Sequence, residues 1–162
     1  MARKLSTRTG TFLTAAAVAL LSATGAQAEY RVAAFLNAPG FDAIMEGDYD
    51  SAARNGAMRA PVTAFGVNTN LCVSQLMSES LTEALESCNK ALRQLPERSP
   101  LSMEARRANE SVVLSNRGVV LAMQGNLLAA EEDFVRALKL DDENANAEAN
   151  LSQIRSLKMS LR

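Results

Sequence analysis

The sequence predicts an all-α protein built from antiparallel pairs of helices. Aromatic residues make up 4% of the chain and Trp is absent, so Leu, Ala, Val and Met must fill the core. Such a composition suits closely packed helices. Apolar residues recur at helical spacing between Thr82 and Leu92. Between Ser111 and Asn144, small residues recur at intervals that would let two antiparallel helices touch.

Residues 111–144 carry the most specific of these patterns. Counted from Ser111, small or large apolar residues stand at positions 8, 11, 15, 17, 20, 24 and 27, which are Gly118, Leu121, Gly125, Leu127, Ala130, Phe134 and Ala137. This 34-residue layout resembles the tetratricopeptide repeat. The resemblance implies a helix–turn–helix unit that stacks with its neighbours into a short α–α superhelix, and that binds partners rather than catalyses.

A second match begins at Phe65 and is weaker. Cys72 stands where the repeat usually has Gly, and Cys88 where it usually has an aromatic residue. An insertion follows, and Ser102 within it resembles the start of a helix. We therefore predict a repeat domain over residues 61–162, with repeats at about 65–98 and 111–144, an insertion at 99–110 and a capping helix at 145–161.

One residue type agrees between the predicted repeats although it was not used to align them. Asn70, Asn116 and Asn150 all fall at position 6 of their repeats. This agreement supports the register. In that register, helices are expected at about residues 62–77, 81–95, 101–123, 128–140 and 144–161.

Residues 1–28 have the parts of a secretory signal peptide. Three basic residues precede a short apolar run at 12–21, and Ala26-Gln27-Ala28 offers the small residues that signal peptidase reads. We expect cleavage after Ala28 and a periplasmic or secreted mature chain. The alternative is a retained membrane anchor, for which the run is short. Cleavage would change the formal charge of the chain from −1 to −4. Nucleic-acid-binding proteins usually carry a basic surface, so this charge does not favour a nucleic-acid partner.

Residues 29–60 are expected to form an N-terminal segment with a degenerate half-repeat. The first part, residues 29–35, contains Tyr30, Val32 and Phe35, and could be either a short strand or an extended arm. Further on, residues 47–52 resemble the turn between the two helices of a repeat. The helix before that turn is expected to be short, because a proline interrupts it.

The two cysteines, Cys72 and Cys88, are expected to form a disulfide. An even number of cysteines in an exported chain favours a bridge. The resemblance places one cysteine on each helix of the same repeat. The alternative is that the two side chains are buried separately as small core residues.

No residue pattern indicates a metal, a cofactor or a catalytic site. The chain has no His, which excludes Ser-His and Cys-His pairs. The acidic clusters at residues 131–133 and 141–143 lack the alternating spacing of a calcium-binding loop. We therefore expect no cofactor, no metal and no enzymatic activity.

The resemblance also implies that the first helix of each repeat lines a groove for a protein or peptide. Val73 and Val119 stand where a clamp for a peptide carboxylate needs Asn or Lys, so such a clamp is not expected. The alternative to an open groove is that the N-terminal segment or a second copy of the chain covers it. The predicted groove residues are Thr69, Asn70, Val73, Leu76, Met77, Val112, Ser115, Asn116, Val119 and Met123.

These inferences favour a non-enzymatic periplasmic adaptor that binds a protein or peptide through the predicted groove. The chain looks like a small exported protein of a Gram-negative bacterium. Two alternatives stay open: a self-associating structural homodimer that buries the groove, and a non-catalytic subunit of an enzyme that acts on the envelope. We expect neither a nucleic-acid partner nor a membrane span after cleavage of the signal peptide.

Overall fold

The computed structural model describes residues 21–25, 28–59, 65–95 and 102–161. Within these residues the chain forms seven helices and one small antiparallel sheet of two strands. The predicted all-α class of helical hairpins is confirmed. The helices are α1 (Phe41–Met45), α2 (Tyr49–Arg59), α3 (Phe65–Met77), α4 (Leu81–Arg93), α5 (Met103–Met123), α6 (Leu127–Leu140) and α7 (Ala145–Ser160), and the strands are β1 (Leu21–Gly25) and β2 (Ala28–Val32).

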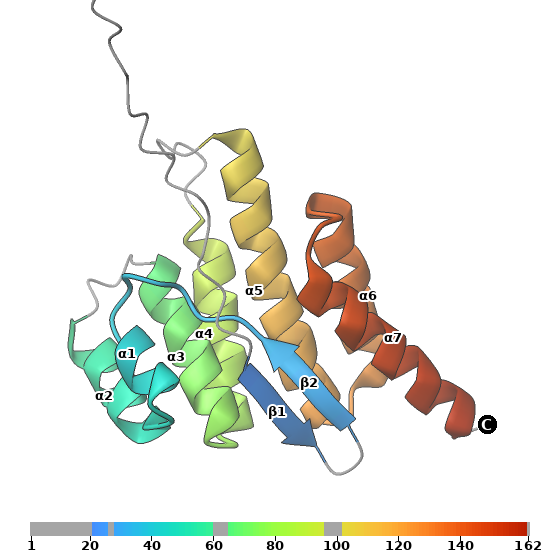
Figure 1. The fold of residues 1–162 in the computed structure, drawn as a ribbon, viewed down its shortest axis with the longest axis horizontal. Coiled ribbons are helices and arrows are strands. Elements are labelled where there is room, and N and C mark those ends of the chain that lie inside the picture. The colour runs from blue at the N-terminus through green and yellow to red at the C-terminus, as the bar shows by residue number, and fades with distance from the viewer. Residues whose placement is uncertain (1–20, 26–27, 60–64, 96–101, 162) are drawn as a thin grey trace, which may run out of the picture.

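Two helical hairpins, α3 with α4 and α5 with α6, form the body of the molecule, and α7 packs against the second (Figure 1). Small residues allow this close packing. A Cβ atom at Gly118 of α5 would come within 2.6 Å of Cε1 of Phe134 on α6. Glycine therefore lets the fully buried Phe134 ring lie directly against the α5 backbone.

Polar side chains begin three of the helices. Ser102 accepts a hydrogen bond from a backbone N–H of the first turn of α5, and Asn126 and Asn144 cap α6 and α7 in the same way. The predicted start at Ser102 is thus confirmed. A left-handed backbone conformation at Gly125 (φ 83°) makes the tight turn between α5 and α6.

The predicted helices agree with the observed ones to within two residues where both are described. Helix α4 ends at Arg93, two residues before the predicted end, and α6 begins one residue earlier than predicted. Residues 62–64 and 101, which the sequence assigned to helices, lie outside the described residues. So do residues 96–98 of the predicted first repeat and 99–100 of the predicted insertion.

The predicted half-repeat corresponds to the short α1 and the longer α2. Gly47, in a left-handed conformation (φ 77°), makes the turn between them. Asp48 accepts a hydrogen bond from the backbone N–H of Ser51, in the first turn of α2. Helix α2 packs on α3 because Gly56 gives room to the Leu71 side chain, whose atoms lie 2.9 Å from where a Cβ would be.

The N-terminal segment lies across the helices as extended chain. Of the two predicted alternatives, a strand and an arm, residues 28–32 form the strand β2. Residues 33–35 continue from it before a turn that begins at residue 36. Strand β2 contacts α5 and α7, with β1 along its other side (Figure 1). Strand β1 falls within the predicted signal peptide, of which residues 1–20 and 26–27 lie outside the described residues.

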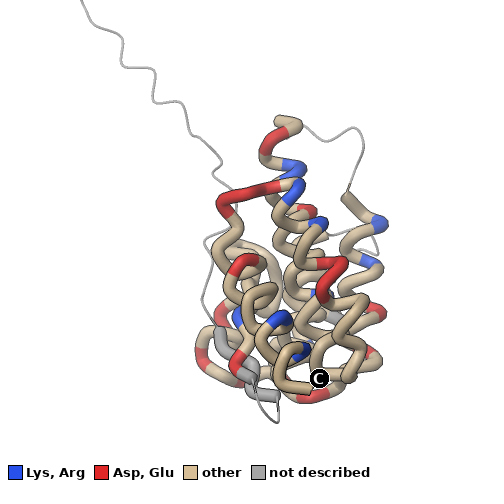
Figure 2. Tube along the Cα trace, turned by 90° about the vertical axis from the view of Figure 1, so that its right-hand side faces the viewer, with Lys and Arg blue, Asp and Glu red and all other residues tan. Residues whose placement is uncertain are grey.

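The surface carries charges of both signs. In the view of Figure 2, acidic and basic residues are interspersed over the helices. Among the described residues, every helix is either too short or too polar to cross a membrane.

Candidate functional site

The first helices of the repeats, α3, α5 and α7, share one face, which we call the helix A face. It is the surface predicted as a ligand groove, and residues 29–36 of the same chain lie along it. The predicted alternatives were an open groove and a groove covered by the N-terminal segment or by a second copy of the chain. In the structure the N-terminal segment covers it.

Three asparagines hold the backbone of this segment. Asn150 accepts a hydrogen bond from the N–H of Arg31 and donates one to its carbonyl, both at 2.8 Å. Asn116 makes the same pair with Ala33 at 2.9 and 2.8 Å. Each carboxamide therefore satisfies both backbone groups of one residue, as a neighbouring strand would.

Asn70 continues the pattern at the next alternate residue. It accepts from the N–H of Phe35 at 2.7 Å and donates to the Phe35 carbonyl at 3.0 Å. Its N–H groups also lie 3.3 Å from the carbonyls of Ala38 and Pro39, where the chain turns toward α1. Asn70 therefore holds both the end of the extended segment and the turn that follows it.

Gln153 serves the residue at the other end of the segment. Its carboxamide lies 2.9 Å from the backbone nitrogen of Glu29 and 2.6 Å from the Glu29 carbonyl, oriented so that oxygen accepts and nitrogen donates. We call these four side chains the amide ladder: Asn70, Asn116, Asn150 and Gln153. They hydrogen-bond to the backbone of residues 35, 33, 31 and 29, respectively, which are every second residue of an extended chain.

The segment also fills the space between the helices with apolar side chains. Tyr30, Val32 and Ala34 are buried and belong to one core cluster with residues of α3, α5 and α7. Burial raises the pKa of the Tyr30 hydroxyl above its ordinary value, because the charged form loses water. Phe35 packs edge-on against Phe65 of α3, with ring centroids 5.0 Å apart.

The predicted groove residues lie together on the helix A face, but in different roles. Only Asn70 and Asn116 reach the backbone of the segment. Val73, Leu76 and Val119 are completely buried and belong to the core. The remaining residues are buried or half-buried around them: Thr69, whose hydroxyl donates to the Phe65 carbonyl, Met77, Val112, Ser115 and Met123.

Sequence reasoning missed Asn150 and Gln153 as site residues. Both lie on the predicted capping helix, and in the structure their side chains bind the backbone of the segment. For Asn150 a signal existed, because it shares position 6 with Asn70 and Asn116. For Gln153 the sequence contains no comparable signal.

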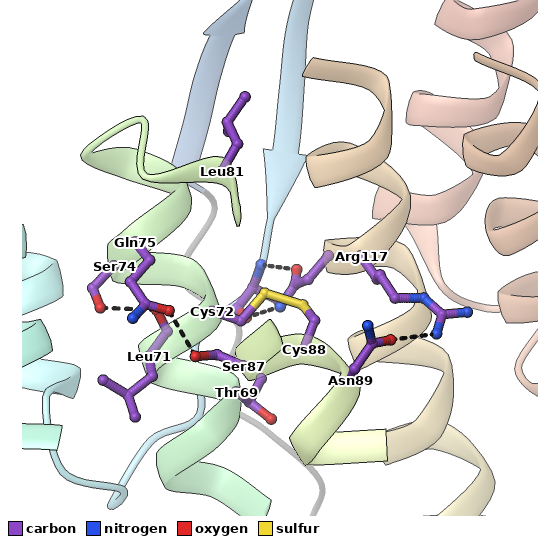
Figure 3. Close-up of a disulfide and its surroundings, with 12 residues drawn as sticks. Thr69, Leu71, Cys72, Ser74, Gln75, Leu81, Ser87, Cys88, Asn89 and Arg117 are labelled. Carbon is purple, nitrogen blue, oxygen red and sulfur yellow. Dashed lines mark hydrogen bonds between the residues drawn. A yellow bond between two sulfur atoms is a disulfide. The ribbon is translucent and has the colours of Figure 1, made fainter. Parts of the chain in front are cut away.

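Beneath this face, a disulfide joins the two helices of the first repeat. Cys72 of α3 and Cys88 of α4 are bonded (S–S 1.98 Å), and both are completely buried. Beside the bridge, Gln75 and Ser87 form a further contact between the same two helices (Figure 3). The bridge thus holds α3, which carries Asn70, against α4.

On the side of α4, α5 and α6, a partly buried ion pair connects three helices. Arg117 donates two hydrogen bonds to Asp133, at 2.6 and 2.7 Å, and a third to Asn89 at 2.8 Å. A polar pocket of about 340 Å³ lies there, lined by Asn89, Leu92, Arg93, Glu110, Arg117 and Arg136. No group of three or more His, Cys, Asp or Glu side chains that could hold a metal occurs in the part of the chain that the structure describes.

Comparison with known proteins identifies the fold. Searches of protein-family models and of curated proteins find no match. Among solved structures, the chain is similar to the first TPR domain of human RPAP3 (TM-score 0.61, 24% identity, 75% of this chain and 87% of that one). It is also similar to the second TPR domain of human RPAP3 in complex with an HSP70 peptide (0.58, 24%, 72% and 88%) and to the first TPR of Spaghetti bound to an HSP90 peptide (0.60, 23%, 74% and 87%). The chain therefore has the fold of tetratricopeptide repeat domains.

Proposed function

We propose that this chain is a non-enzymatic protein-interaction module that binds a partner polypeptide at its helix A face, against the N-terminal segment that covers this face. In this proposal it is a small exported bacterial protein that acts as an adaptor in the periplasm. The fold hosts many functions, so the proposal depends on the site and not on the fold.

The amide ladder is the observation that carries the proposal. Four carboxamides grip the backbone at alternate residues and leave the side chains of Glu29 and Arg31 exposed to solvent. The ladder therefore holds residues 29–35 as a fixed extended chain, a form of backbone on which peptide binding by strand addition occurs. Two of the similar solved structures hold peptides, named as HSP70 and HSP90 peptides, which is consistent with binding of a peptide on this fold.

Export rests on different support. Residues 1–28 have the composition of a signal peptide with a cleavage site after Ala28. A buried disulfide suits an oxidising compartment such as the periplasm and would be unusual in the cytosol. Both features favour a mature chain that begins at Glu29.

A binding role also fits the side-chain inventory. The chain has no His, and its best-formed polar cluster is the Arg117–Asp133 pair, whose groups satisfy each other. General acid–base catalysis needs a group poised to exchange a proton with substrate. The four carboxamides of the amide ladder are instead engaged with the backbone of the N-terminal segment.

Site-specific photocrosslinking in the exporting cell tests this function. The ladder holds the backbone of Arg31, and the Arg31 side chain is exposed. A photoreactive residue placed at this position should give an adduct with one specific protein other than this chain. The same residue placed at Leu128, which is 67% exposed on α6, is the matched control and should not give that adduct. Asn150→Ala should weaken the adduct at position 31.

Two outcomes would contradict the proposal. Equal adducts from positions 31 and 128 would mean that contact is unspecific. Adducts of the chain with itself alone would favour the alternative of a self-associating homodimer.

A further inference from the structure

We propose that the outer edge of β2 binds an extended strand of a partner protein, in the place that β1 holds in the structure. The outer edge is the side of residues 30–32 that faces away from the amide ladder. This inference rests on the proposed export, because cleavage after Ala28 removes Leu21–Gly25 and leaves β2 without its neighbour.

The two edges of the segment have different partners. Backbone groups of successive residues in a strand point to opposite edges. Because Arg31 gives both of its groups to Asn150, the groups of Tyr30 and Val32 point to the other edge. There β1 pairs with them antiparallel, with Ala23 opposite Tyr30 and Leu21 opposite Val32.

Loss of β1 would leave the outer edge open but the segment still in place. The ladder and the buried side chains of Tyr30, Val32 and Ala34 belong to the part of the chain that remains. A fixed edge with free N–H and carbonyl groups is the template on which strand addition occurs. Residues 29–32 remain after cleavage and pair with four residues of β1 in the structure, so this edge has room for four residues in antiparallel register.

The surroundings of the edge define the chemistry of the occupant. A residue that pairs with Tyr30 or Val32 lies on the same side of the sheet as those buried side chains, so small or apolar residues fit there. A residue opposite Glu29 or Arg31 lies on the exposed side, where an opposite charge is favourable. The partner segment is therefore an antiparallel strand that alternates apolar and polar residues.

A backbone-methylated peptide tests the edge directly. The probe is a soluble synthetic peptide with the sequence Leu21–Gly25 between polar tails, titrated into mature protein whose first residue, Glu29, is verified by mass. We expect saturable shifts of the Tyr30 and Val32 amide signals by NMR. Methylation of the peptide nitrogen at Ala23, which faces β2, should weaken binding about fivefold or more, since it removes a backbone hydrogen bond.

Three controls separate the possible results. Methylation at Ser22, which pairs opposite Arg31 and directs its N–H away from β2, should leave binding almost unchanged. The uncleaved chain, with its disulfide formed in vitro, should not bind the peptide, because β1 already occupies the edge. The amides of Ala33 and Phe35 should keep their protection from exchange when the peptide binds, because the ladder still holds the segment.

The outcomes that overturn the edge proposal differ from those that overturn the proposed function. If verified mature protein does not bind the peptide, or if both methylations weaken binding equally, the edge proposal is wrong while the proposed export is unaffected. Release of the Ala33 and Phe35 amides would show displacement of the segment from the ladder instead. A dimer that forms through β2 would mean that the edge binds a second copy of the chain and not a different protein. A chain purified from the exporting cell that still carries residues 1–28 would contradict both the proposed export and the edge proposal.

Discussion

At the scale of single residues, the amide ladder explains why asparagine recurs at one position of each repeat. A carboxamide offers a donor and an acceptor side by side in one plane, as a peptide group does. Aspartate cannot donate at neutral pH, and a hydrophobic residue leaves both backbone groups unsatisfied. Asn70, Asn116 and Asn150 therefore match the alternate residues of an extended chain.

Asn116→Ala should destabilise the protein markedly. The substitution leaves the N–H and carbonyl of Ala33 without partners in a site that is 3% exposed. Each unsatisfied buried group costs about 1–3 kcal/mol, so we expect a loss of about 3 kcal/mol in the free energy of unfolding, measured in urea. Asn55→Ala, an exposed asparagine on α2, is the control and should change stability by less than about 0.5 kcal/mol.

Gly118→Ala should destabilise by steric overlap. The added methyl would lie 2.6 Å from the Phe134 ring, too close without movement of α5 or α6. We expect a cost of about 1–3 kcal/mol by thermal or urea unfolding. The double variant Gly118→Ala/Phe134→Leu should lose less than the sum of the two single changes, and strict additivity would show that the contact does not cause the loss.

Glu131 should contribute a pH-dependent part of the stability. Hydrogen bonds from Lys158 and Arg155 of α7 hold the pKa of the Glu131 carboxyl below its ordinary 4.5. A carboxyl group whose pKa is lowered by folding stabilises the folded protein at pH values above the pKa that the group has in the unfolded chain. That stabilisation is lost as the pH falls through the pKa of the group in the folded protein. The stability difference between wild type and Glu131→Gln should therefore be present at pH 7 and shrink below about pH 4.5, whereas a constant difference would refute the linkage.

At the scale of elements, the small residues and caps of the repeats determine how the helices pair. The positions of Gly118, Gly125, Ala130 and Phe134 in the sequence predicted the hairpin of α5 and α6, because glycine and alanine are needed where helices touch. The role of Ser102 as a helix cap could be predicted for the same reason, since its chemistry is local.

The course of the N-terminal segment could not be predicted in the same way. The ladder binds the backbone groups of the segment, and side chains that bind backbone impose no pattern on the sequence that they hold. Asn150 and Asn116 lie 119 and 83 residues from Arg31 and Ala33 along the chain. The shared position of the asparagines was visible, but what they bind became visible only when residues 29–36 were placed against them.

The disulfide should be the main covalent restraint on the first hairpin. Cys72 and Cys88 are 16 residues apart, and a bridge that closes a loop of this length contributes about 3 kcal/mol in the chain-entropy model. Urea unfolding with and without reductant should show a loss of about that size. The double variant Cys72→Ala/Cys88→Ala should not respond to reductant, and a wild-type protein equally unresponsive would mean that the bridge is absent in solution.

At the scale of the whole molecule, the N-terminal segment completes the helical array. Helices α3, α5 and α7 do not bury all of their apolar surface against each other, and Tyr30, Val32 and Ala34 fill the space that remains. Repeat arrays with few units need such a cover, because each unit is stabilised mainly by its neighbours. The same cover provides the edge at which we infer that a partner strand adds.

The most direct test of this account is amide hydrogen exchange of the mature chain, followed residue by residue by NMR. The account predicts slow exchange at Arg31, Ala33 and Phe35, whose N–H groups the ladder binds, and fast exchange at Tyr30 and Val32 once β1 is gone. Such alternation along one short strand would establish the ladder in solution. Uniformly fast exchange from residue 30 to residue 35 would contradict it.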